Sequence, residues 1–91
     1  MGAVADAIRS KLEAAFAPSR LEITDDSENH RGHAGHREGG ESHFTVVIEA
    51  GAFSGQNRVA RQRMVHAALA EELAGPVHAL SVKALAPGEQ P

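Results

Sequence analysis

The chain contains no cysteine, no tryptophan and no tyrosine among its 91 residues. Without cysteine it can form no disulfide and can donate no thiolate to a metal, so iron–sulfur chemistry would need sulfur ligands from a partner. Three phenylalanines are its only large aromatic side chains, which leaves few surfaces on which single-stranded bases could stack. The lack of cysteine also fits a reducing compartment.

Long apolar runs and an excess of positive charge are missing as well. No apolar stretch approaches the roughly 20 residues that cross a bilayer, and the first residues lack the basic start and apolar centre of a secretion signal. The formal net charge is −3 with neutral histidines, which argues against broad binding to phosphate backbones. A chain of this length builds a modest core. We therefore expect one cytoplasmic domain over residues 1–91, without a membrane segment.

Histidine, in contrast, is concentrated. Four of the six histidines lie in the glycine-rich stretch 30–43, and His78 lies in a distant apolar run. Imidazole titrates near neutral pH and is the commonest metal ligand in proteins, so the cluster indicates a binding site. Glycines allow many backbone conformations, which suits a site that is completed only when a partner binds.

Apolar periodicity predicts two helices. An apolar residue recurs at every fourth position from Val4 to Phe16, with Ala5 and Ala15 beside this stripe, and the helix should end before Pro18. A second helix is expected from Arg58 to Gly75-Pro76, where Gly75 would adopt the left-handed conformation of a helix cap. Its predicted apolar face consists of Met64, Val65, Ala68, Leu69 and Leu73.

Three strands are predicted from alternating patterns at residues 21–24, 44–49 and 77–85. The first two should be antiparallel, whereas the third follows a helical crossover and could be parallel to one of them. The core should span residues 4–85, with a flexible loop at about 26–41 and a frayed tail at 86–91. Long loops in small domains are usually functional or disordered. The expected fold is α+β, with helices on one face of a small three-stranded sheet.

Five segments, in order and at the right spacing, resemble the BolA family, and the resemblance covers roughly residues 4–87. The sequence differs from many members at Gln62, where they carry histidine. The segments are DDSENH (25–30), ESHF (41–44), RQRMV (61–65), AALAEEL (67–73) and VHALSV (77–82).

The resemblance implies a class II KH-like fold with the order α-β-β-α-β, and it implies two roles. Many members pair with monothiol glutaredoxins and share a [2Fe–2S] cluster with them, in cluster assembly, trafficking or iron sensing. Some bacterial members are described as transcriptional regulators that bind DNA. The chain is thus expected to be a bacterial BolA-like adaptor or regulator.

In the cluster-sharing role, the resemblance implies that His78 is the metal ligand at the third strand. His30 matches the first position of the family's loop and is the expected second ligand, with His33 as the alternative. The partner's cysteine and a bound glutathione would supply thiolates. We expect no cofactor in the isolated chain, a monomer when alone and a heterodimer with glutaredoxin.

The remaining histidines have simpler interpretations. We expect His36 to be solvated, His43 to anchor the second strand and His66 to lie on the surface of the second helix. Zinc or another divalent ion could also bind three loop histidines, because histidine-rich tracts capture such metals.

In the regulator role, Arg58, Arg61 and Arg63 at the start of the second helix could contact phosphates or base edges. They could equally form an ordinary solvated face, or bind an acidic partner or the carboxylates of glutathione. Residues 32–35 spell the GXXG clamp of KH domains, but between strands instead of helices, which favours a chance match. No nucleophile elbow, phosphate loop or metal-hydrolase motif is present, so we expect no enzymatic activity.

Overall fold

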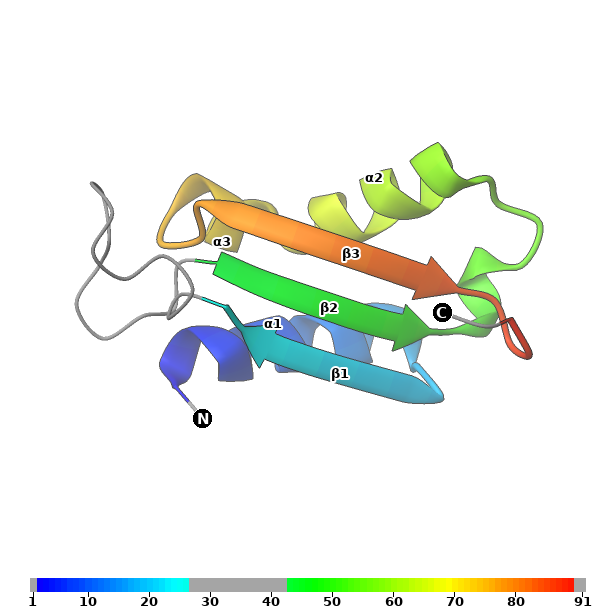
Figure 1. The fold of residues 1–91 in the computed structure, drawn as a ribbon, viewed down its shortest axis with the longest axis horizontal. Coiled ribbons are helices and arrows are strands. Elements are labelled where there is room, and N and C mark those ends of the chain that lie inside the picture. Colours follow the sequence, from blue (N-terminus) through cyan, green and yellow to red (C-terminus); the bar gives the residue numbers. More distant parts are fainter. Residues whose placement is uncertain (1, 27–42, 90–91) are drawn as a thin grey trace.

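The computed structural model describes residues 2–26 and 43–89. Its elements follow the predicted order, except that the second helix is divided (Figure 1). In these two ranges, no helix has the length and apolar character needed to span a membrane. The elements are α1 (Ala3–Phe16), β1 (Arg20–Asp25), β2 (His43–Glu49), the 3-10 turn η2 (Gly51–Phe53), α2 (Arg58–Ala68), α3 (Ala70–Ala74) and β3 (Ala79–Leu85).

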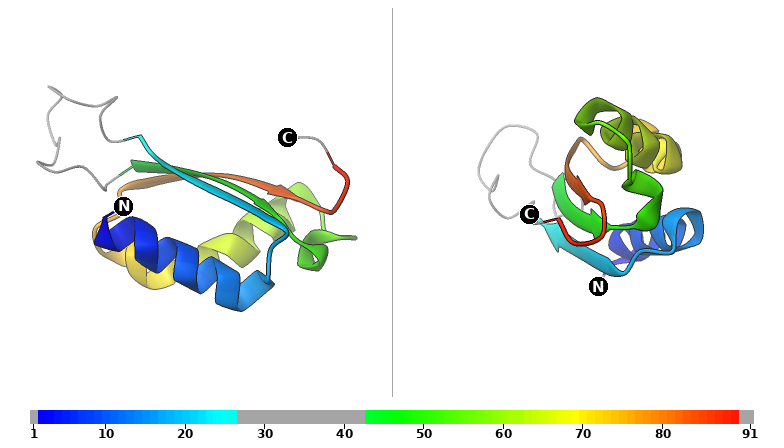
Figure 2. Two further views of the ribbon diagram at one scale, coloured as in Figure 1. Left: turned by 90° about the horizontal axis from the view of Figure 1, so that it is seen from below. Right: turned by 90° about the vertical axis from the view of Figure 1, so that its right-hand side faces the viewer.

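The strands form one sheet in the order β1-β2-β3. β1 and β2 are antiparallel, as predicted, and β2 and β3 are parallel. A parallel pair needs a crossover connection, which α2 and α3 provide. The helices cover one face of the sheet and leave the other open (Figure 2). The structure therefore confirms the predicted α+β architecture, and its element order is consistent with a class II KH-like arrangement.

The core lies between the sheet and the helices. Ile8 and Leu12 of α1 are fully buried, as their spacing predicts, and the ring of Phe16 lies 5.1 Å from that of Phe53. Ala15, in contrast, is exposed, so the apolar stripe of α1 is narrower than expected. The burial of these apolar side chains is the main force that holds the helices on the sheet.

The second predicted helix is not continuous. The backbone leaves the helical region at Leu69 (φ −109°, ψ 23°), which separates α2 from α3. Val65 and Leu69 are nonetheless buried, and Leu73 packs against the same core. Because both pieces face one core, the apolar spacing continues through the break and could not reveal it.

A cluster of charges connects α3 to α1. Lys11 Nζ lies 2.6 Å from a Glu71 oxygen and 2.8 Å from a Glu72 oxygen. A hydrogen bond from Lys11 lowers the pKa of Glu71, and hydrogen bonds to both carboxylates raise the pKa of Lys11. Glu72 is only 9% exposed, so Lys11 supplies the opposite charge that a buried carboxylate requires.

Gly75 ends α3 in a different way from the predicted one. Its φ is −110°, so the expected left-handed cap is wrong. A Cβ atom at this position would lie 3.3 Å from the Glu71 carbonyl oxygen, a tight contact that would require this carbonyl to shift by a few tenths of an ångström. The Val77 N–H donates to the Glu72 carbonyl (2.9 Å), and β3 begins two residues later than predicted, at Ala79.

Residues 86–89 of the expected frayed tail are described, while 90–91 lie outside the described residues, as does most of the predicted loop 26–41. Ala86 is buried (8% exposed), and the Glu89 N–H donates to its carbonyl (3.0 Å). The Gly88 N–H donates to the carboxylate of Glu49 on β2 (3.3 Å). Residues 86–89 therefore form a turn fastened to the sheet, which we call the C-terminal turn.

Candidate functional site

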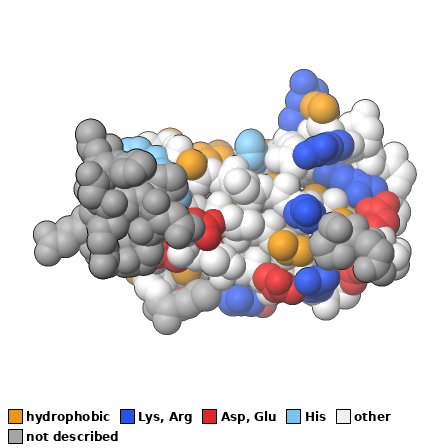
Figure 3. All heavy atoms as spheres, viewed as in Figure 1, with side chains coloured by type: hydrophobic (Ala, Val, Ile, Leu, Met, Phe, Trp, Pro, Cys, Tyr) orange, Lys and Arg blue, Asp and Glu red, His pale blue; other side chains and the backbone are white. Residues whose placement is uncertain are grey.

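His78 lies immediately before β3 and is exposed to solvent. Since β2 and β3 are parallel and His43 pairs in register with Ala79, the two histidines start neighbouring strands at the same end of the sheet. Their rings are stacked, with centroids 6.3 Å apart and an interplanar angle of 17°. Figure 3 shows histidine side chains at this end, on the left of the view. The sequence placed His78 inside the predicted strand 77–85, whereas in the structure it lies just before β3 and is exposed.

His43 anchors the start of β2, as expected, and its contact with His78 was not foreseen. It is half-buried, and its carbonyl accepts a hydrogen bond from the Asp26 N–H (2.7 Å). Nearby, the Thr45 hydroxyl donates to the Asp26 carboxylate. These contacts join the end of β1 to the start of β2, so Asp26 and His43, the described residues on either side of 27–42, lie at the end of the sheet where His78 lies (Figure 1).

The other predicted ligands cannot be placed in the same way. His30, His33 and His36 lie outside the described residues, and the predictions for them stay predictions. His66 is exposed on α2, in agreement with its expected surface position. Within residues 2–26 and 43–89, no three side chains of the types His, Cys, Asp and Glu come close enough to hold a metal ion.

The exposed imidazole of His78 fits one ligand position of a [2Fe–2S] site. Such a cluster takes four ligands, usually thiolates, and imidazoles can replace two of them on one iron. The exposed ring of His78 can supply one such ligand. The chain has no thiol, so further sulfur ligands must come from another molecule.

Of the three predicted contact arginines, Arg61 has a different role from the expected one. Its side chain is only 15% exposed. Its Nε donates to the Gln56 carbonyl (2.9 Å), and its Nη1 donates to the Ala84 carbonyl (3.1 Å). Arg58 and Arg63 are exposed, as expected for contact residues. Sequence reasoning treated the three as equivalent because they are neighbours on one helix.

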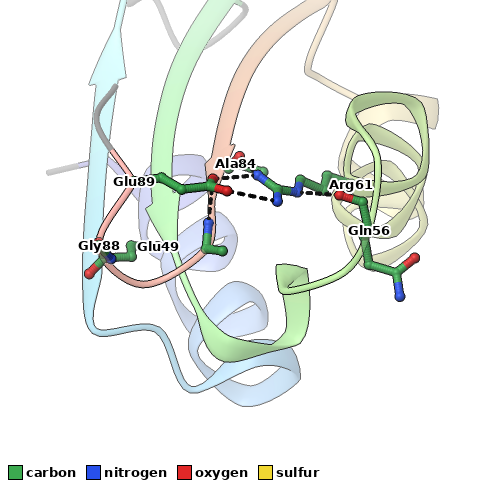
Figure 4. A network of polar contacts seen from close by, with 7 residues as sticks. Glu49, Gln56, Arg61, Ala84, Gly88 and Glu89 are labelled. Atoms are coloured by element: carbon green, nitrogen blue, oxygen red, sulfur yellow. Dashed lines mark hydrogen bonds and ion pairs between the residues drawn. The ribbon is translucent and has the colours of Figure 1, made fainter.

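Glu89 completes the contacts of Arg61. Both carboxylate oxygens accept from the guanidinium, at 2.6 and 3.2 Å (Figure 4). Hydrogen bonds from Arg61 and from the Ala86 N–H lower the pKa of Glu89 to about 2. We call the contacts of Arg61 with Gln56, Ala84 and Glu89 the Arg61 latch, because they connect α2 to β3 and to the C-terminal turn.

Gln62, the position that departs from many members of the resembled family, also connects α2 to β3. Its Nε2 donates to the Val82 carbonyl at 2.7 Å. The Leu85 carbonyl accepts from Ala50 (3.0 Å), and carbonyls alternate in direction along a strand. Those of Val82 and Ala84 therefore point to the outer edge of β3, where Gln62 and Arg61 satisfy them.

Comparison with known proteins identifies the family. The model of the BolA-like protein family matches residues 12–89. BolA-like protein 1 of Homo sapiens is 45% identical over 89 residues, which cover 98% of this chain and 62% of the human protein. The DNA-binding transcriptional regulator BolA of Escherichia coli is 43% identical over 79 residues, which cover 87% of this chain and 71% of that protein. The chain thus spans somewhat less than two thirds of its mammalian relatives.

Solved structures agree with this assignment. The BolA domain of SufE1 from Arabidopsis thaliana superposes with a TM-score of 0.88 at 39% identity, covering 99% of both chains. BolA1 from the same plant gives a TM-score of 0.85 at 36% identity over the full length of both chains. The sequence match, the topology of the sheet and these superpositions together show that the chain belongs to the BolA-like family.

Proposed function

We propose that this protein is a non-enzymatic, cytoplasmic adaptor that forms a heterodimer with a monothiol glutaredoxin and shares a [2Fe–2S] cluster with it, in cluster assembly, trafficking or iron sensing. The observation that carries the proposal is the exposed imidazole of His78 at the start of β3. It lies at the same end of the sheet as Asp26 and His43, the described residues on either side of 27–42.

The composition explains why a partner is needed. In this proposal His78 donates one nitrogen, His30 donates a second, and the partner's cysteine and a bound glutathione donate the thiolates. The cluster would supply a one-electron redox centre, whose potential rises when imidazoles replace thiolates. Imidazole binds metal in its neutral form, so assembly should weaken as the pH falls below the histidine range.

Chain length allows His30 to take part. His30 follows Asp26 by four residues, and four residues span at most about 14 Å. Asp26 is hydrogen-bonded to the start of β2 (2.7 Å), at the end of the sheet that carries His78. His33 is three residues farther along and is the alternative second ligand.

A mixing experiment tests the proposal. Adding the chain to cluster-loaded monothiol glutaredoxin should change the visible absorption and circular dichroism of the cluster. His78→Ala should suppress this change, whereas His66→Ala, which removes an exposed histidine of α2, should preserve it. A spectrum that responds equally to both variants would remove His78 from the ligand set.

The same assay identifies the second ligand. His30→Ala should abolish the spectral change if His30 is bound to the iron, and His33→Ala should leave it intact. The reverse pattern would assign the role to His33. If neither substitution has an effect, the loop does not supply a ligand.

Binding of DNA is the second candidate, supported by the name of the relative from Escherichia coli and by the exposure of Arg58 and Arg63 on α2. A fluorescence anisotropy titration at several salt concentrations measures it, because each lost phosphate contact reduces the salt slope by about 1. Binding that survives His78→Ala but is lost without Arg58 and Arg63 would favour the regulator. Arg61 is a poor probe here, because its substitution also disturbs the latch.

A further inference from the structure

A groove of about 500 Å³ lies between α2 and β3, at the opposite end of β3 from His78. Its lining includes Arg58, Arg61 and Gln62 from the helix and Val82, Lys83 and Ala84 from the strand. Sites for small ligands commonly enclose roughly 300–1,000 Å³. The groove is therefore large enough for a small molecule, and it shares no residue with the proposed cluster site.

The charge of the groove is positive. Arg58, Arg61 and Lys83 line it, and none of the described residues of its lining is acidic. Figure 3 shows Lys and Arg side chains gathered over the start of α2 and the end of β3. Glu89 neutralises Arg61 from the C-terminal turn, which leaves the charges of Arg58 and Lys83.

Arg58 lies on the helix side of the groove. The side chain of Lys83 starts on the open face of the sheet, because those of Val82 and Ala84 face the core, and it can reach the groove around the edge of β3. Together these two charges suit a doubly charged anion.

The edge of β3 decides what kind of ligand the groove can take. A peptide in extended conformation would bind by pairing with the strand edge. The outward carbonyls of Val82 and Ala84 are already occupied by Gln62 and Arg61, at 2.7 and 3.1 Å. A pairing strand would have to break both contacts, so recognition here depends on side chains instead of strand pairing.

We propose that this groove binds a small molecule that carries a phosphate monoester, with Arg58 and Lys83 as the main contacts. A phosphate monoester carries close to two negative charges at neutral pH, which matches these two cations. Arg61 holds Glu89 with a two-point contact (Figure 4), and this is also how guanidinium groups bind phosphate. The carboxylate of Glu89 therefore competes with a bound phosphate for the guanidinium of Arg61.

The test is a titration of the full chain, labelled with nitrogen-15, with glycerol 3-phosphate, followed by amide chemical shifts. The side-chain amide of Gln62 and the backbone amides of residues 82–85 should shift in a saturable way. Arg58→Ala and Lys83→Ala should each weaken binding about tenfold, the size of one charge-assisted contact. Glu89→Gln should tighten it, because Arg61 becomes available.

Two controls separate this site from general attraction of anions. Arg9→Ala removes the same charge from α1, where Arg9 lies 3.9 Å from Glu13, and should leave binding unchanged. Dimethyl phosphate, a singly charged diester, should bind much more weakly. The proposal is overturned if no amide of residues 82–85 shifts, if Arg9→Ala weakens binding as much as Arg58→Ala, or if the diester binds equally well.

A DNA duplex provides the last arm of the experiment. If the duplex shifts the same amides at micromolar concentration and glycerol 3-phosphate does not, the groove recognises a nucleic acid backbone and the small-molecule assignment is wrong. Thermal unfolding of each variant, compared with the unmodified chain, shows whether a loss of binding reflects a loss of fold. These titrations and unfolding measurements use no iron–sulfur cluster, so failure of the phosphate proposal leaves the proposed role of His78 unaffected.

Discussion

The two ends of β3 use their polar side chains in opposite ways. At the C-terminal end, Arg61, Gln62 and Glu89 connect α2, β3 and the C-terminal turn by hydrogen bonds and an ion pair. At the N-terminal end, His78 is exposed and stacks on His43. The polar side chains at the C-terminal end thus hold elements of the fold together, whereas the imidazole at the N-terminal end is exposed to solvent. A charged or titratable residue in a suggestive motif can therefore be structural or functional, and its contacts decide which.

The largest expected difference between the two ends is in stability after removal of Arg61. Arg61→Ala should lower the melting temperature by several degrees, because the carbonyls of Gln56 and Ala84 and the carboxylate of Glu89 all lose a donor. His78→Ala and Arg63→Ala, both at exposed positions, should change it little. Thermal unfolding at neutral pH, followed by circular dichroism, measures all three. Equal melting temperatures for the three variants would contradict the claim that Arg61 stabilises the fold more than His78 or Arg63.

A smaller loss is expected from Gln62. Gln62→Ala removes the donor to the Val82 carbonyl and should reduce the free energy of unfolding by about 1 kcal/mol, the usual net value of one hydrogen bond. Urea denaturation is the suitable measurement. Gln56→Ala is a matched control, since Gln56 is exposed and contributes to the Arg61 latch through its backbone carbonyl. If both substitutions lower the free energy of unfolding equally, the hydrogen bond from Gln62 to the Val82 carbonyl adds nothing to stability.

The smallest effect concerns pH. Arg61 and the Ala86 N–H lower the pKa of Glu89 from 4.5 to about 2. A lowered pKa in the folded state means that the ionised carboxylate stabilises the fold above pH 4.5 and that this contribution is lost as the pH falls towards 2. Glu89→Gln should therefore be less stable than the unmodified chain at neutral pH, and the difference should shrink in acid. Melting temperatures between pH 7 and pH 2 test this, and a constant difference would contradict it.

Much of the fold followed from apolar spacing. Ile8, Leu12 and Val65 are fully buried, as the helical periodicity predicts, and the order of elements was correct up to the division of the second helix. The break at Leu69 was invisible because its side chain remains in the core. The φ of Gly75 was mispredicted because glycine adopts negative φ as readily as positive φ, and the sequence does not distinguish the two.

The candidate site was less predictable because it depends on contacts between distant segments. The sequence placed His78 within the third strand, whereas it lies just before β3, and its stacking on His43 depends on the parallel register of β2 and β3. The role of Arg61 was missed because its partner, Glu89, is 28 residues away in a segment whose proline and glycine content suggested fraying. Neither contact produces a periodic pattern along the chain.

The most direct test of the central claim asks whether a nitrogen of this chain is bound to the iron. The chain is labelled with nitrogen-15 histidine, combined with unlabelled glutaredoxin, glutathione and cluster, reduced, and examined by electron–nuclear double resonance. The account predicts nitrogen-15 couplings of directly bound imidazole, one of which disappears in His78→Ala and persists in His66→Ala. A spectrum without such couplings, or one that His78→Ala leaves unchanged, would contradict it.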